Sequence, residues 1–161
     1  MKILRFFLFF LLSVTSCVYS FRGFSGVETY RVFVDLFRNA SEKAGIEADV
    51  TRWVIQELEQ DVRISLVSEN KAKYKFIVTL KGYRVEPQDY KPDGTVLSYK
   101  VIIISYLTVE DLSSQTKVVE DKMLSSWGTY ASLQSEEEGL KIASQDLARR
   151  IMQEFLNSVS R

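Results

Sequence analysis

Residues 72–80, AKYKFIVTL, and residues 97–109, LSYKVIIISYLTV, place apolar side chains at alternate positions. A period of two in aromatic and β-branched residues is typical of β-strands. Between them, Lys91-Pro92-Asp93-Gly94 indicates a turn, because proline presets φ and glycine tolerates a positive φ. A third strand is predicted from about Lys117 to Tyr130, although its apolar residues fall on both parities and leave its buried face open. Consecutive strands with short turns predict an antiparallel meander.

The flanking segments predict one more strand and two helices. Residues 27–37 alternate as a strand does, with four apolar side chains on one face: Tyr30, Val32, Val34 and Leu36. Apolar residues recur at three- and four-residue steps from Ile46 to Leu58 and again from Leu140 to Val159, which predicts two amphipathic helices. Two helices cannot cover both faces of such a sheet. The predicted fold is therefore α+β: a two-layer α/β sandwich with a mostly antiparallel four-stranded sheet, both helices on one face and the order β-α-β-β-β-α.

The N-terminus has the pattern of a lipoprotein signal. Lys2 and Arg5 precede a short apolar run, and small residues then lead to the single cysteine, Cys17. The run is too short to span a membrane. We expect residues 1–16 to be a signal peptide, Cys17 to be the lipid-attachment site, residues 17–26 to be a lipidated tether and residues 27–161 to be one domain. The alternative is an ordinary signal with a cysteine near the cleavage point.

Composition excludes several classes of function. The chain has 21 basic and 21 acidic residues, so net charge gives no argument for nucleic-acid binding. It has no histidine, which removes the commonest metal ligand and the usual catalytic base. Carboxylate pairs such as Glu110-Asp111 are interpreted as solvated hairpin charges. No enzymatic activity, metal or cofactor is predicted.

Four segments together resemble the LptE family of lipopolysaccharide-assembly lipoproteins. They are the opening CVYSFRG at residues 17–23, which departs from the family at Val18 where glycine is usual, Phe37-Arg38-Asn39, the hairpin at residues 93–99 and the stretch Glu137–Leu156. The resemblance implies a non-enzymatic protein held by its lipid at the periplasmic face of the outer membrane. It also implies a partnership with an outer-membrane β-barrel of the LptD type, as plug and folding aid, and lipopolysaccharide binding.

Two sets of side chains are candidates for binding. Lys75, Lys81, Lys100 and the whole apolar set fall on the strand parity opposite the predicted core, whereas Arg84 follows the first strand, Lys91 lies at the hairpin and Lys117 lies on a neighbouring strand. The basic set gives candidate contacts to lipopolysaccharide phosphates, unless it only solvates the face: Lys75, Lys81, Arg84, Lys91, Lys100 and Lys117. The apolar set gives a candidate partner interface: Ile77, Tyr83, Ile102, Ile104 and Tyr106. The alternative is that the parity is inverted and the helices cover this face.

A different function stays open at this point: a periplasmic lipid or glycolipid carrier with its ligand in a cavity between sheet and helices. A carrier needs room there, whereas a plug needs a packed core. The dense apolar stripes on both predicted helices favour packing.

Overall fold

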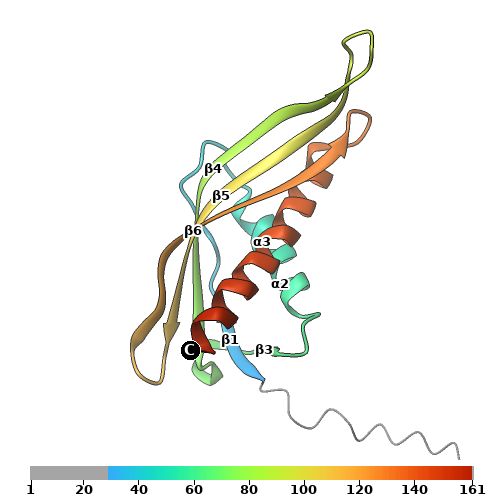
Figure 1. The fold of residues 1–161 in the computed structure, drawn as a ribbon. Helices are drawn as coiled ribbons and strands as arrows, with labels where there is room; N and C mark the ends of the chain where they lie inside the picture. The colour runs from blue at the N-terminus through green and yellow to red at the C-terminus, as the bar shows by residue number, and fades with distance from the viewer. Residues whose placement is uncertain (1–28, 161) are drawn as a thin grey trace, which may run out of the picture.

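The computed structural model describes residues 29–160 (Figure 1). The expected signal peptide, Cys17 and the tether lie outside these residues. The elements in chain order are β1 (Tyr30–Val34), β2 (Arg38–Asn39), α2 (Glu47–Leu58), β3 (Ile64–Leu66), the short 3₁₀-helix η1 (Glu69–Lys71), β4 (Tyr74–Tyr90), β5 (Val96–Asp111), β6 (Thr116–Ala131) and α3 (Glu136–Val159). Among residues 29–160, no helix is both long and apolar enough to cross a membrane.

The α+β class is confirmed, with a sheet of six strands instead of four. Five of them lie in the order β3-β1-β4-β5-β6, and β2 pairs with β4. β4, β5 and β6 form the expected antiparallel meander, whereas β1 runs parallel to both β3 and β4. The helix α2 makes the crossover that a parallel pair requires. β2 has only two residues, too few for a period to be visible in the sequence. β3 falls in the stretch where Val62, Ile64 and Leu66 alternate, a pattern that predicts a short extended piece.

Strand β1 ends earlier than expected. The prediction continued it through Phe37 and placed Leu36 on its apolar face, but the strand stops at Val34 and Leu36 is 61% exposed. The chain turns here because the Phe37 N–H donates to the Thr51 hydroxyl of α2 over 3.0 Å. Phe37 therefore enters the core in place of Leu36.

A β-bulge explains why the third strand showed no single parity. Val109 pairs with Val119 and Leu107 pairs with Lys122, so β6 carries one extra residue between these two pairs. Asp121 lies in this bulge with a φ of +43°. Such a bulge exchanges the two faces of a strand. The buried positions of β6 accordingly change from odd at Val119 to even at Leu124, Ser126 and Tyr130.

One layer of helices covers one face of the sheet. In Figure 1, α3 runs across the sheet and α2 lies beside it. Leu147 and Ile151 of α3 are fully buried, as are the facing side chains of β4 and β5 at Phe76, Val101 and Ile103. The ring of Phe155 meets three other rings edge-on at centroid distances of 5.0–5.2 Å, those of Tyr30, Tyr74 and Phe76.

Two glycines set the distance between α3 and β6. A Cβ on Gly128 would lie 2.5 Å from both the Ala143 nitrogen and the Gly139 oxygen, which are backbone atoms. A Cβ on Gly139 would lie 2.4 Å from Cδ1 of Tyr130 and 2.8 Å from Cγ2 of Val101. The two backbones therefore approach more closely than any side chain would allow.

We predict that Gly128→Ala lowers the free energy of unfolding by about 1–3 kcal/mol in urea, because overpacking forces α3 away from the sheet. The matched control is Gly82→Ala in β4, whose Cβ would meet only the flexible side chain of Ile104, at 3.4 Å. The control should change stability by less than about 0.5 kcal/mol. Equal stability of the two variants would contradict the close approach.

Candidate functional site

The candidate site lies on the sheet face opposite the helices. Along β5, Val101, Ile103 and Ser105 are fully buried beneath the helix layer. Ile102 and Ile104 alternate with them and are half-buried on the other face. Since neighbouring side chains on a strand point to opposite faces, the parity of β5 was predicted correctly. We call the uncovered side of the sheet the outer face.

Six apolar side chains lie on the outer face along β4, β5 and β6, and we call this set the apolar band. Ile104 covers Gly82 of β4, and Tyr106 lies between Thr79 and Met123 on the neighbouring strands. Ile102 pairs with Trp127. The band consists of Ile77, Ile102, Ile104, Tyr106, Met123 and Trp127.

Met123 and Trp127 were missed by the sequence analysis. The two residues are 58% and 47% exposed. The bulge in β6 hid them, because the strand shows no single parity in sequence. Their cross-strand partners, Tyr106 and Ile102, had been placed on the outer face. A correct register between β5 and β6 would have identified both residues.

Tyr83 was wrongly placed on the outer face. It pairs with Ile103, is only 9% exposed and belongs to the core. The reason is an irregularity in β4 at Lys81: Leu80 pairs with Ser105 and Gly82 with Ile104, so one residue is extra and the parity changes beyond it.

The Tyr83 hydroxyl donates a hydrogen bond of 2.7 Å to Glu136, the first residue of α3. Burial, with this bond, raises the pKa of Tyr83. The bond from Tyr83, followed by the one from Lys43, lowers the pKa of Glu136. Lys43 Nζ lies 3.1 Å from the same carboxylate. The hydrogen bond from Tyr83 therefore links β4 to the start of α3.

Several of the candidate basic residues are already paired with carboxylates. Lys75 lies 2.6 Å from Glu69 and 3.7 Å from Asp35, and its bond to Glu69 raises its pKa. Lys117 lies 2.7 Å from Glu120, which raises its pKa in the same way. An anion approaching either lysine must compete with an internal acid. These two residues are the weakest phosphate candidates of the set.

The six basic candidates do not converge on one place. Lys91 lies at the β4–β5 turn and Lys117 lies near the β5–β6 turn, at opposite ends of the long hairpins (Figure 1). A strand of 16 residues spans about 50 Å. Only part of the set can therefore contact one ligand.

A smaller cluster lies at one end of the apolar band. Arg84 pairs with Ile102, which pairs in turn with Trp127. The ammonium of Lys100 lies 4.7 Å from the centroid of the Trp127 ring, a cation–π geometry. Lys100 thus stacks on an exposed aromatic ring beside the apolar band, and Arg84 lies on the other side of Ile102 with Glu86 3.9 Å from its guanidinium. Such a cluster can bind a ligand that carries both phosphate and hydrocarbon.

The space that a lipid carrier would need is filled by side chains. Leu80 and Leu107 of the sheet and Phe155 of α3 are fully buried. A groove of about 480 Å³ does open at one end of the helix pair, away from the sheet-facing core. Within residues 29–160, no group of three or more acidic, cysteine or histidine side chains could hold a metal ion.

The fold and the family comparison indicate the same class of protein. Residues 30–155 match the LptE family model, described as lipopolysaccharide-assembly, and this match spans more than three quarters of the chain. The chain belongs to the LptE family. Its role is thus in lipopolysaccharide assembly.

Solved structures share the fold. The protein CT253 from Chlamydia trachomatis aligns with a TM-score of 0.59 at 11% identity, covering 81% of this chain and 98% of that one. Protein XCC0632 from Xanthomonas campestris, of family DUF330, aligns with a TM-score of 0.58 at 11% identity, covering 83% and 88%. No curated protein sequence matches.

We predict that Tyr83→Phe lowers the free energy of unfolding by about 1 kcal/mol at pH 7, because it removes a hydrogen bond to a carboxylate. The folded state lowers the pKa of Glu136, so this contribution is complete above the ordinary value of 4.5 and is lost as the pH falls below it. Urea titrations at pH 7 and pH 3.5 measure the difference. Tyr106→Phe, on the outer face, is the control and should stay within about 0.5 kcal/mol. A pH-independent loss would show that Glu136 is not involved.

Proposed function

We propose that this protein is a lipid-anchored outer-membrane assembly factor that partners an LptD-type β-barrel in lipopolysaccharide transport and insertion. Its membership of the LptE family supports the role in assembly. The observation that carries the proposed partnership is the apolar band on the outer face. The protein acts here by binding, as plug and folding aid, and no catalytic step is proposed.

The apolar band has the composition of a binding surface. Exposed contiguous apolar patches on soluble domains often mark interfaces, and Tyr, Trp and Met are enriched there. Met123 and Trp127 are about half exposed, and Ile104 lies flat over Gly82. Removing apolar surface from water contributes about 25 cal/mol per Å² before the costs of association. The outer face is therefore the proposed contact with the barrel.

The cluster of Arg84, Lys100 and Trp127 is the proposed contact with lipopolysaccharide. A guanidinium binds phosphate oxygens through paired N–H donors, and an ammonium supplies a compact charge. Lys81 and Lys91 are exposed and can add weaker, screened contributions. The position of the cluster at the end of the apolar band would let acyl chains and phosphates be bound by adjacent surfaces.

The lipid anchor is the proposed source of membrane attachment. Residues 1–16 would be removed, Cys17 would carry the lipid and residues 17–26 would connect it to the domain. Val18 after the cysteine is not the aspartate associated with inner-membrane retention in some bacteria, which supports attachment at the periplasmic face of the outer membrane.

Mass spectrometry of the protein extracted from membranes tests the anchor. We expect a mature N-terminus at Cys17 with about three acyl chains, since the thiol and the new amino group are both acylated in bacterial lipoproteins. A mature chain that begins elsewhere and carries a free thiol would contradict the proposal.

Ile104→Asp tests the barrel interface. We expect at least a tenfold loss of co-purification with the barrel from detergent extract, because a carboxylate would be transferred into a dry contact. The monomer should stay folded, since Ile104 is only half-buried. The control is Val62→Asp, a 67% exposed apolar residue between α2 and β3, which should bind as wild type. Equal binding by all three proteins would exclude the outer face.

Lys100→Gln tests the lipopolysaccharide contact. We expect about a threefold weaker affinity in low salt, because an exposed charge contact contributes 1 kcal/mol or less, and a smaller difference at high ionic strength. Lys117→Gln is the matched control, because Lys117 is paired with Glu120. A larger loss of affinity in the control would indicate that the binding site lies nearer the β5–β6 turn.

A further inference from the structure

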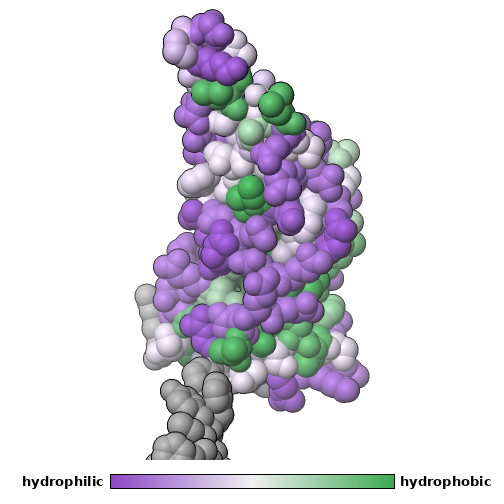
Figure 2. Space-filling model, turned by 90° about the vertical axis from the view of Figure 1, so that its right-hand side faces the viewer, coloured by the Kyte–Doolittle hydropathy of each residue, from purple (hydrophilic) through white to green (hydrophobic). Residues whose placement is uncertain are grey.

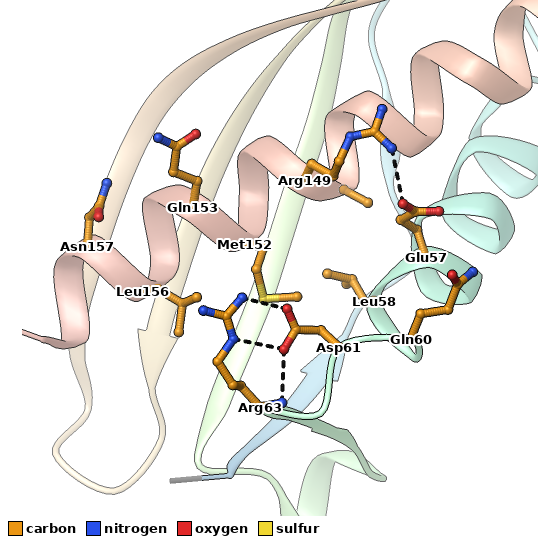
Figure 3. A pocket seen from close by; sticks show the side chains of 11 residues that line it. Glu57, Leu58, Gln60, Asp61, Arg63, Arg149, Met152, Gln153, Leu156 and Asn157 are labelled. Atoms are coloured by element: carbon orange, nitrogen blue, oxygen red, sulfur yellow. Dashed lines mark hydrogen bonds and ion pairs between the residues drawn. The ribbon is translucent and has the colours of Figure 1, made fainter. Parts of the chain in front are cut away.

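A groove opens where the end of α2 meets the second half of α3 (Figure 3). Its volume is about 480 Å³. Four apolar side chains form its floor: Leu58, Ala148, Met152 and Leu156. Figure 2, viewed from the side on which α2 lies, shows hydrophobic residues gathered toward this lower end of a mainly hydrophilic surface. The groove therefore offers apolar contact area.

The charged side chains that line the groove are neutralised by one another. The Arg63 side chain donates two hydrogen bonds to Asp61, of 2.9 and 2.6 Å, and this hydrogen bonding is the largest cause that lowers the pKa of Asp61. Arg149 of α3 reaches across to Glu57 of α2, 3.1 Å away (Figure 3). A phosphate-bearing ligand would have to break these pairs. An uncharged apolar group can enter between them.

The chain enters the domain at the edge of this groove. The Tyr30 N–H donates to the backbone oxygen of Arg63 over 2.8 Å. The Tyr30 ring meets Phe155 edge-on at 5.2 Å, and Phe155 is the neighbour of Leu156. In Figure 1, the start of β1 and the end of α3 lie together at the same end of the molecule. The described chain therefore begins next to the groove.

We propose that residues 21–27, FRGFSGV, bind in this groove through Phe21 and Phe24. The segment offers two aromatic side chains that carry no charge, which is what the groove accepts. Phe24 lies five positions before Thr29, and this stretch can span about 17 Å. The α3 residues from Ala148 to Leu156 extend over only about 12 Å. Tethering also raises the local concentration of the segment to the millimolar range, which an unlinked peptide or lipid would have to match.

Docking would shorten the stretch of chain between the proposed lipid anchor and the domain. Between Cys17 and Thr29 an undocked chain could extend about 40 Å, whereas the chain from Cys17 to Phe24 can extend only about 25 Å. This consequence rests on the proposed lipid anchor, but the docking itself does not. Failure of the anchor would appear in the mass of the mature N-terminus, and failure of docking would not change it.

Photo-crosslinking tests the docking. A benzoylphenylalanine at Phe24 of the full chain in membranes is irradiated, and the products are mapped by mass spectrometry. We expect crosslinks within the same chain to Leu58, Met152 or Leu156. The same probe at the exposed Tyr90, in the distal turn, should give none of these products. Crosslinks from Phe24 to lipid, to another protein or to the outer face would overturn the proposal and assign the groove to that other occupant.

Cleavage by trypsin after Arg22 gives an independent measurement. A docked segment should be cut slowly, and Leu156→Ser should increase the rate at least fivefold by removing part of the floor. Leu156 is partly exposed, so the domain should stay folded. The control is Leu133→Ser at the 98% exposed residue of the β6–α3 turn, which should leave the rate unchanged. A wild-type rate equal to that of Leu156→Ser would overturn the proposal.

Discussion

The contact between Gly128 and Gly139 fixes how closely α3 lies on the sheet. A Cβ on Gly128 would lie 2.5 Å from backbone atoms of the helix, so the position has room only for hydrogen. Ser105 and Ser126 nearby are fully buried, and their hydroxyl oxygens have no hydrogen-bond partner within the described chain. Leaving a buried hydroxyl unpaired costs about 1–3 kcal/mol. The small size of serine therefore explains its presence at these two positions better than its polarity does. The close approach lets one helix layer seal one face of the sheet and leaves the outer face uncovered.

Much of this architecture could be predicted, because β4, β5 and α2 carry regular patterns. The alternation from Tyr74 to Leu80 identified a buried face, and the helical spacing from Ile46 to Leu58 identified another. The failures arise where a strand gains a residue. The irregularity at Lys81 and the bulge at Asp121 each exchange the faces of a strand, and local sequence carries no clear signal of either. Tyr83 was misplaced for this reason, and Met123 and Trp127 were missed.

The candidate site could be predicted only in part, since its chemistry depends on pairing between distant residues. A lysine opposite an apolar face suggests phosphate binding in sequence, yet Lys75 is held by Glu69 and Asp35. Conversely, the stacking of Lys100 on Trp127 can be predicted only when the register between β5 and β6 is known. The structure thus reduces six dispersed cations to a cluster at one end of the apolar band. This face is the basis of the proposed contacts with a barrel and with a phosphorylated lipid.

Hydroxyl-radical footprinting of the chain, alone and in complex with the proposed barrel partner, tests the central claim that the outer face is the surface that binds it. Met123 and Trp127 are readily oxidised and about half exposed in the free protein. The account predicts that both become strongly protected in the complex, while oxidation of the exposed Leu36, between β1 and β2, and Val62, between α2 and β3, stays unchanged. Unchanged oxidation of Met123 and Trp127, together with protection on the helix side, would contradict it.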